Sequence, residues 1–265
     1  RYASYHCFMF RRLVLSRPIA TLAAFMVFGI GCLLGNWQIN RMQEKIMAAN
    51  DLMAKEMASP ITINRQSLTL NQVLHRSVVA RGTYLVNKTI WLENRPHPQG
   101  QDPKTGIAAG FYVLTPMLLE GADGIVWVNR GWAPRNMLDR TKLPEILTPT
   151  GVIEVQGIAF EGAARVMNIG GAYSGSESAA SNILQNFDLN KEAQQFGGKQ
   201  LPFVIRQSPN HNLDGLSRDW AAPTSGAEKH QGYAFQWFAL AALQLLLYLW
   251  FQWIKPYRHV RNSTS

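Results

Sequence analysis

The 265-residue chain is short of cysteine, short of charge and without the common catalytic motifs. Its two cysteines exclude a disulfide scaffold and leave no pair at zinc-finger spacing. Only 16% of the residues are charged, well under the roughly one quarter typical of globular domains. Phosphate-binding glycine loops and the G-x-S-x-G elbow of hydrolases are missing. No H-x-x-x-H pair occurs, so no zinc site is evident and we expect no enzymatic activity.

Acidic residues are missing from both ends of the chain. Residues 1–37 carry four arginines and residues 233–265 carry three basic residues, and neither segment contains an acid. The other 19 basic residues lie in the middle with all 17 acids, so most of the net charge of +9 belongs to the ends. A nucleic-acid-binding protein would carry its excess of basic residues on the folded domain. We therefore expect no nucleic-acid partner.

Each basic end adjoins a long apolar run without charge, Ile19–Trp37 and Tyr233–Ile254. A helix needs about 20 apolar residues to cross a membrane, so both runs qualify as transmembrane helices. Buried soluble helices and, for the first run, a cleaved signal peptide are the alternatives, but G-N-W-Q-I-N-R is a poor cleavage site. We expect a tail at 1–18, a span at 19–37, a juxtamembrane helix at 38–59, an exported β-rich domain at 60–229, a second span at 230–254 and a tail at 255–265.

The basic flanks also predict the orientation. Lysine and arginine mark the cytoplasmic side of a span, so both termini are expected inside and the central domain outside. The sequence begins at Arg1, and its short basic start lacks an obvious presequence rich in serine and arginine. This favours the inner membrane of a bacterium with the domain in the periplasm. The alternative is the mitochondrial inner membrane, with the domain in the intermembrane space.

The central region has the texture of a β protein. Short β-rich runs alternate with turn residues, and no βαβ alternation or internal repeat is visible. The fold class we expect is a membrane protein whose two transmembrane helices flank a mainly antiparallel, partly closed barrel of the α+β type. The expected strands are 73–85, 88–93, 111–118, 125–130, 151–160, 183–189 and 201–207, with a short helix at 189–196, a hairpin turn at 121–124, a polar loop at 94–106 and a mobile Gly/Ser/Ala-rich segment at 170–181.

The second apolar run has one ordered polar and aromatic face. At about 100° per residue the members share a stripe of roughly 80°. Such a stripe faces a partner, a ligand or the other span, and a neutral histidine in it is a natural ligand of haem iron. The alternative is a histidine that simply lies at the membrane interface. The stripe consists of His230, Tyr233, Trp237, Ala241, Gln244 and Tyr248.

Three further patterns suggest contacts. Gly31 and Gly35 have the spacing that lets membrane helices approach closely, although the two glycines can also be incidental. Trp37 and Arg41 are four residues apart where the first span ends, so the guanidinium can lie against the indole, or both can be plain interfacial anchors. The Asn-Arg pairs ending at Arg95 and Arg130 close two expected strands. Their guanidiniums can bind a carboxylate such as a propionate, or make internal salt bridges and turn hydrogen bonds.

These residues belong to segments that resemble the Surfeit locus protein 1 family, the assembly factors of haem-copper cytochrome c oxidase. The matching segments are L-G-N-W-Q-I-N-R (34–41), G-T-Y (82–84) with E-N-R-P (93–96), G-F-Y-V-L-T-P (110–116) with V-N-R-G-W-A-P (128–134), and H-Q-G-Y-A-F-Q-W-F-A-L (230–240). Their order, the two expected spans and the length agree, so the resemblance covers nearly the whole chain. The stretch 98–109 is longer than the usual link, which leaves open any role for His97.

The resemblance implies a non-enzymatic assembly factor that helps to insert haem a into subunit I, and some bacterial members of the family bind haem a. The family's histidine at the start of the second span matches His230, which would be the axial ligand, with Tyr233 and Trp237 beside the porphyrin. Independently of the resemblance, our own hypothesis from the two Asn-Arg pairs is that Arg95 and Arg130 hold the propionates. Gln38, Arg41 and Gln244 belong to the face offered to partners, which are subunit I and, as further candidates, haem A synthase and other oxidase assembly factors. The alternatives are a scaffold for subunit I without haem, and a membrane-anchored exported enzyme, ligand-binding or sensor domain.

Overall fold

The computed structural model describes residues 18–64, 68–139, 142–163, 182–209, 214–222 and 224–254. The chain forms two compact units, one built from residues up to Asp51 together with those from Thr224 onward, the other from Leu52–Pro223. The expected mobile segment at 170–181 lies outside the described residues, as do almost all of the two tails. The first unit is helical and the second is built around a sheet.

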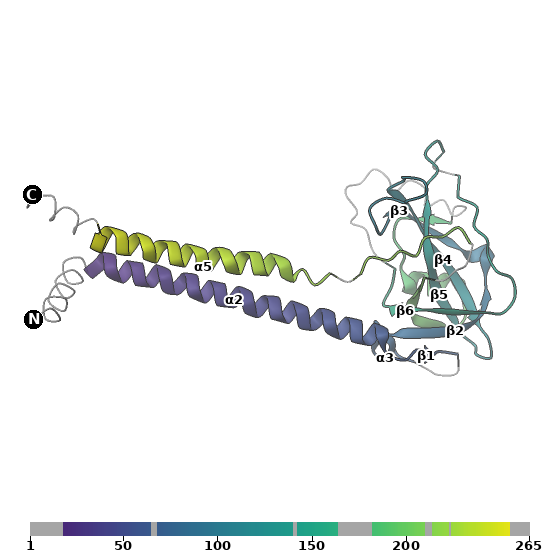
Figure 1. The fold of residues 1–265 in the computed structure, drawn as a ribbon. Helices are drawn as coiled ribbons and strands as arrows, with labels where there is room; N and C mark the ends of the chain where they lie inside the picture. Colours follow the sequence, from purple (N-terminus) through teal and green to yellow (C-terminus); the bar gives the residue numbers. More distant parts are fainter. Residues whose placement is uncertain are drawn as a thin grey trace, which may run out of the picture. The chain divides into compact units, whose positions relative to one another are not determined.

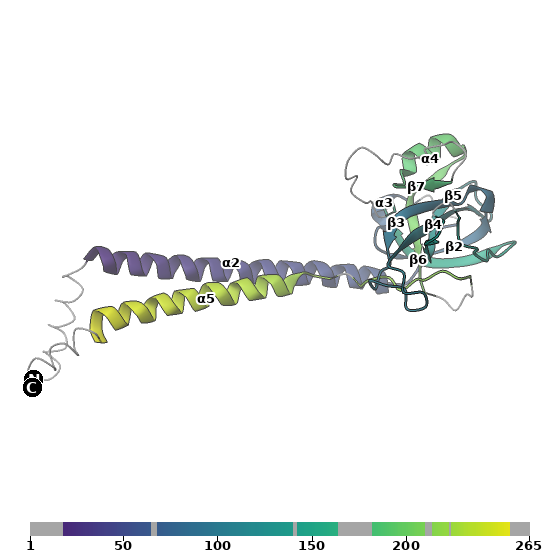
Figure 2. The same cartoon turned by 90° about the horizontal axis from the view of Figure 1, so that it is seen from above.

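Two helices form the first unit, and they run side by side in Figures 1 and 2. The first, α2 (Pro18–Met57), has 40 residues and joins the expected span and juxtamembrane helix without a break. It can do so because no proline lies between Pro18 and Pro60, and the helix ends shortly before Pro60. The second, α5 (Ala227–Leu249), begins after Gly226 at φ 64° and continues as the π-helix η2 (Trp250–Ile254). Both helices are long and apolar enough to cross a membrane.

Small side chains form the seam between α2 and α5. A Cβ on Gly31 would lie 2.9 Å from the Cβ of Ala241, and a Cβ on Gly35 would lie 2.7 Å from the Phe238 ring. The buried positions recur at steps of three, four or seven residues, which is the pattern of antiparallel helices packed in a left-handed crossing. They are Thr21, Ala24, Gly31, Gly35 and Gln38 on α2, and Ala227, Ala234 and Ala241 on α5.

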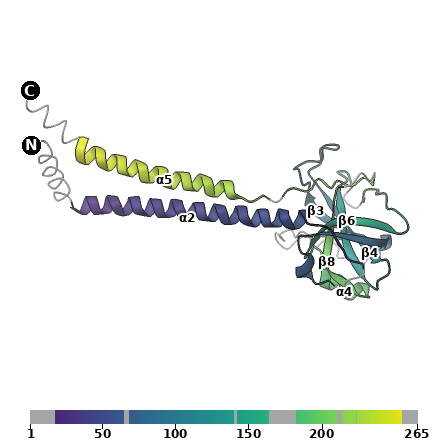
Figure 3. The same cartoon turned by 60° about the horizontal axis from the view of Figure 1, so that its bottom comes forward.

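The second unit contains a closed barrel of five strands, seen from two sides in Figures 1 and 3. Its strands pair in the order β2–β6–β8–β5–β4, and β4 pairs again with β2. Only β5 and β8 are parallel within this ring. The strands are β1 (Ile61–Thr62), β2 (Ser77–Tyr84), β3 (Ile90–Pro96), β4 (Ala109–Leu119), β5 (Ile125–Pro134), β6 (Ile153–Phe160), β7 (Ile183–Leu184) and β8 (Gln200–Gln207).

One glycine lets the barrel close. Gly82 pairs with Leu119 where β2 meets β4, and a Cβ on Gly82 would lie 2.1 Å from the carbonyl oxygen of Leu118. No other residue fits so close an approach of two backbones. The glycine of the G-T-Y segment is therefore required for the close approach of β2 and β4.

Apolar side chains fill the barrel and cover its outside. The interior cluster includes Val78, Met117, Val128, Val155 and Phe203. A second cluster around Trp127 is covered by α4 (Leu189–Phe196), which lies beside β7 and β8 (Figures 2 and 3). The short segments α3 (Leu70–Val73) and η1 (Val86–Lys88) complete the unit.

The expected fold class is confirmed, and the sequence placed most elements correctly. The helix at 189–196 is observed as predicted, because Asp188 caps it by accepting hydrogen bonds from the backbone of Asn190 and Lys191. Two strand predictions were too long. The strand expected from residue 73 begins at Ser77, after the helical turn α3, and the strand expected at 183–189 has only two residues.

Candidate functional site

His230 lies in the first turn of α5 and is hydrogen-bonded to Gln38 of α2. The His230 Nδ1 and Gln38 Oε1 atoms are 2.7 Å apart, and Gln38 is only 8% exposed. Because an amide oxygen can only accept, the imidazole must donate from Nδ1, which leaves the lone pair on Nε2. No residue in the described part of the chain hydrogen-bonds Nε2. The half-buried ring therefore presents an unused metal-binding nitrogen.

The polar stripe of α5 faces α2. The sequence left three interpretations of this stripe open, a partner, a ligand or the other span, and the structure shows that it faces the other span. Half-buried Trp237, Gln244 and Tyr248 lie along the seam, and the Tyr248 hydroxyl is 2.9 Å from Oγ1 of Thr21. Tyr233 is the exception, since it is 53% exposed and Ala234 takes the buried position instead. A seven-residue repeat through the buried alanines explains this, because it turns Tyr233 away from the seam.

The residues at the exit of the first span make a different contact from the expected one. The Arg41 guanidinium bonds the carboxylate of Glu44 at 2.6 Å, and Trp37 is more than half exposed. Arg41 therefore turns toward Glu44, one turn further along α2. The alternative interpretation, in which Trp37 is an interfacial anchor, stays a prediction.

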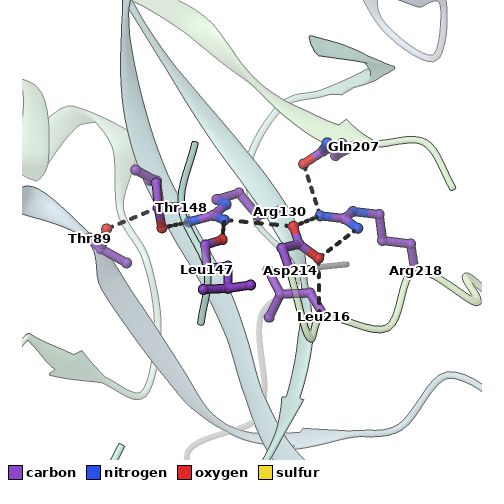
Figure 4. Close-up of polar contacts among 9 residues, drawn as sticks. Thr89, Arg130, Leu147, Thr148, Gln207, Asp214, Leu216 and Arg218 are labelled. Carbon is purple, nitrogen blue, oxygen red and sulfur yellow. Dashed lines mark hydrogen bonds and ion pairs between the residues drawn. The ribbon is translucent and has the colours of Figure 1, made fainter. Parts of the chain in front are cut away.

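Arg130 is fully buried in the barrel unit and uses its donors inside the protein (Figure 4). Its Nη1 donates to Oγ1 of Thr148 at 2.7 Å, and its Nη2 donates to the carbonyl of Leu147 at 2.8 Å. Nη2 also lies 3.6 Å from Oδ2 of Asp214, which binds Arg218 as well. Burial lowers the pKa of the Arg130 guanidinium, an effect opposed by Tyr84 and Asp214. This is the internal ion pair that the sequence left open as the alternative to propionate binding.

The Arg130 cluster fastens two irregular segments onto the barrel. Residues 147 and 148 precede β6, and residues 214–218 follow β8. A backbone pair between Trp132 and Ser217 adds to the attachment. The N-R-G-W segment thus holds down the chain that leads toward α5.

Arg95 is buried as deeply as Arg130, but not all of its hydrogen-bond donors have acceptors among the described residues. It is 1% exposed, and its Nη2 donates to the carbonyl of Gln185 at 2.7 Å. Its Nε and Nη1 have no hydrogen-bond partner among the residues that the structure describes, and its Cζ lies 6.0 Å from the centre of the Tyr112 ring. Burial lowers the pKa of Arg95. Although the Trp132 indole donates to the backbone carbonyl of Arg95, no contact among the described residues joins the Arg95 and Arg130 guanidiniums.

One arginine that contacts aromatic rings, Arg206 on β8, was not among the site residues predicted from the sequence. The Arg206 Cζ lies 4.3 Å from the centre of the Phe160 ring and 5.4 Å from that of Trp220. Its Nη2 is 4.0 Å from Oε1 of Glu56, and burial lowers its pKa. Nothing in the local sequence of β8 separates Arg206 from an ordinary outward-facing arginine, because its partners lie far away in the chain.

His97 contacts a serine, as in a catalytic His-Ser pair, but its imidazole cannot act as the base because the ring proton is on the nitrogen that faces the serine. Its Nδ1 accepts from the backbone N–H of Gln99 at 3.2 Å, so Nε2 carries the proton. That nitrogen faces Oγ of Ser217 at 3.1 Å and has no lone pair to accept its proton. The pair therefore fixes a loop. Within the described ranges, no three His, Cys, Asp or Glu side chains gather as a metal site.

The fold and the two helices define a membrane-anchored barrel protein, and the comparisons define its family. The SURF1 family model matches residues 25–242, so this chain belongs to the SURF1 family. The SURF1-like protein of Rickettsia bellii is 29% identical over 86% of this chain and 88% of its own length. Surfeit locus protein 1 of Xenopus tropicalis is 22% identical over 90% of this chain and 73% of its own length. The match to the SURF1-like protein of Drosophila melanogaster, at 29% identity, spans 52% of this chain and about half, 47%, of that protein.

Proposed function

We propose that this protein is an assembly factor for haem-copper cytochrome c oxidase and assists delivery of haem a into subunit I. Membership of the SURF1 family supports the assembly role. The observation that supports haem binding is the half-buried imidazole of His230, which is held through Nδ1 and whose Nε2 has no hydrogen-bond partner among the described residues. One neutral imidazole is enough to ligate haem iron, so no larger cluster of ligands is required.

The surroundings of His230 fit a large apolar ligand. Exposed Tyr233 and half-buried Trp237 follow His230 on α5, and both offer aromatic surface at the end of the helix pair. Haem is cargo here, and the protein's part is to bind its iron and shield its apolar faces. Within the barrel unit taken by itself, Arg95 has donors without partners among the described residues and could bind a carboxylate such as a propionate, whereas those of Arg130 are already engaged.

The exposed apolar faces of α2 and α5 support docking beside the membrane helices of subunit I. Haem delivered along such a surface never enters bulk water. The basic flanks of the chain favour termini on the inner side and a barrel on the outer side of a bacterial inner membrane. In this role the protein binds and hands over a cofactor, and it catalyses no reaction.

The visible spectrum of the purified protein tests the proposal. The full chain is expressed in cells that make haem a and is purified in detergent. We expect haem a bands in the wild type and their loss in His230→Ala. A matched control is His75→Asn, a histidine of the barrel unit at φ 60°, a conformation that asparagine tolerates. This variant should keep the haem.

Other results would redirect the proposal. A wild-type spectrum without haem bands would leave only a scaffold for subunit I. Normal haem content of the oxidase in a deletion strain would remove the assembly role altogether. Unchanged haem in His230→Ala would remove His230 as the ligand.

A further inference from the structure

We infer that Gln38 is a positioning residue for His230, because its side-chain oxygen holds the proton on Nδ1 and so assigns Nε2 to the haem iron. This inference rests on the proposed function and adds to it a residue that touches neither iron nor porphyrin. The two residues are 192 positions apart in the sequence, and their 2.7 Å contact joins α2 to α5.

The packing of the helix pair holds the Gln38 amide in place. Gln38 is three residues, nearly one turn, beyond Gly35, on the buried face of α2. Because Gly31 and Gly35 lack side chains, α5 comes close enough for Ala241 and Phe238 to touch α2. The helices are therefore near enough at Gln38 for an amide to reach an imidazole directly.

A second interhelical hydrogen bond fixes the register of the pair. Thr21 and Tyr248 are 2.9 Å apart near the other end of the seam. Sliding α5 along α2 by one turn, about 5.4 Å, would break this bond and the Gln38–His230 bond together. The imidazole is thus held both by its partner and by the register of its helix.

The chemistry of the pair makes Gln38 more than a link between helices. A neutral imidazole carries one proton, and the nitrogen that binds a metal must be the one without it. The partner of the other nitrogen sets the tautomer and the ring orientation, and loss of such partners typically weakens metal binding about 10–100-fold. An interhelical hydrogen bond that serves packing alone would hold the two helices together without affecting the tautomer.

The first experiment needs no haem. The full chain is labelled with ¹⁵N-histidine, purified without haem in detergent, and examined by NMR at a pH where imidazoles are neutral. The chain has six histidines, so the His230 signals are those that disappear in His230→Ala. We expect the wild type to show a protonated Nδ1 and a bare Nε2. Gln38→Leu should lose this preference.

The second experiment titrates the same proteins with haem a. We expect Gln38→Leu to bind about 10–100-fold more weakly than the wild type. Gln38→Glu should keep the binding and lower the reduction potential of the bound haem, because a carboxylate accepts the Nδ1 proton more strongly. The control is Gln236→Leu, the same change at an exposed position of α5, which should alter neither measurement.

The two experiments separate the possible failures. A wild type with the proton on Nε2, or a Gln38→Leu variant with unchanged tautomer and unchanged affinity, would overturn the inference while leaving haem binding intact. A wild type that binds no haem a would overturn the proposed function. In that case the NMR result would still decide whether Gln38 orients His230.

Discussion

Arg130→Met should weaken the barrel unit by removing the guanidinium that fastens residues 147–148 and 214–218. Removal of one partner from a buried ion pair typically costs about 3–5 kcal/mol. Here Arg218 still binds Asp214, so the buried carboxylate keeps one of its two cationic partners when Arg130 is removed. We therefore expect a loss near the lower end, about 3 kcal/mol. Asp214→Asn should cost more, because it removes the carboxylate that both Arg130 and Arg218 contact.

Urea unfolding of the full chain in detergent, followed by tryptophan fluorescence, measures these losses, since Trp132 is buried two residues from Arg130. The matched control is Arg81→Met. Its ion pair with Glu120 is 2.6 Å long, but its side chains are 60% and 48% exposed, so the change should cost at most about 1 kcal/mol. If Arg130→Met lost no more stability than Arg81→Met, the reasoning about the buried cluster would be refuted.

Three further changes probe the same unit. Arg95→Met should raise the urea midpoint, because it removes a buried cation with unpaired donors; a lower midpoint would mean that the charge is stabilised. Gly82→Ala should cost about 1–3 kcal/mol and speed hydrogen exchange where β2 meets β4, since its Cβ would clash with the Leu118 carbonyl. Burial raises the pKa of Tyr84 to about 12, above about 10 in the unfolded chain, so stability present below pH 10 is lost as the pH rises toward 12. Tyr84→Phe should reduce this alkaline loss of stability. The free energy of unfolding of both proteins is measured at pH 8 and at pH 11, and an equal decrease between these pH values in the wild type and the variant would contradict the prediction.

The amino-acid pattern was sufficient for the helices and for most strands because both depend on local periodicity. An uncharged run predicts a span, and alternating apolar residues between turns predict a strand, whatever the rest of the chain does. Closure of the barrel depends instead on which strands pair. The parallel contact of β5 with β8 joins segments about 75 residues apart, and no local signal encodes it. The short strand β7 was overestimated for a related reason, since its apolar residues pack on the second cluster outside any long ladder.

The candidate site divides in the same way. The stripe on α5 and the small residues of α2 follow from helical spacing, which puts Gly31, Gly35 and His230 on the faces where the two helices touch. Gln38 also appeared on the partner face, but its pairing with His230 depends on the register of two helices, which spacing alone does not define. The roles of Arg95 and Arg130 looked identical in the sequence. They differ only because Asp214 and the 147–148 segment return to one of them.

That difference between the arginines has an energetic meaning. A buried guanidinium whose donors are satisfied contributes to one fixed structure, and a new acceptor gains little by displacing its partners. Arg130 is in this state. Arg95 is buried among aromatic and backbone groups, and within the described part of the chain its Nε and Nη1 have no acceptor. Any carboxylate able to reach it would therefore relieve an existing cost. Removing Arg95 should therefore raise the stability and lower the function, whereas removing Arg130 should lower both.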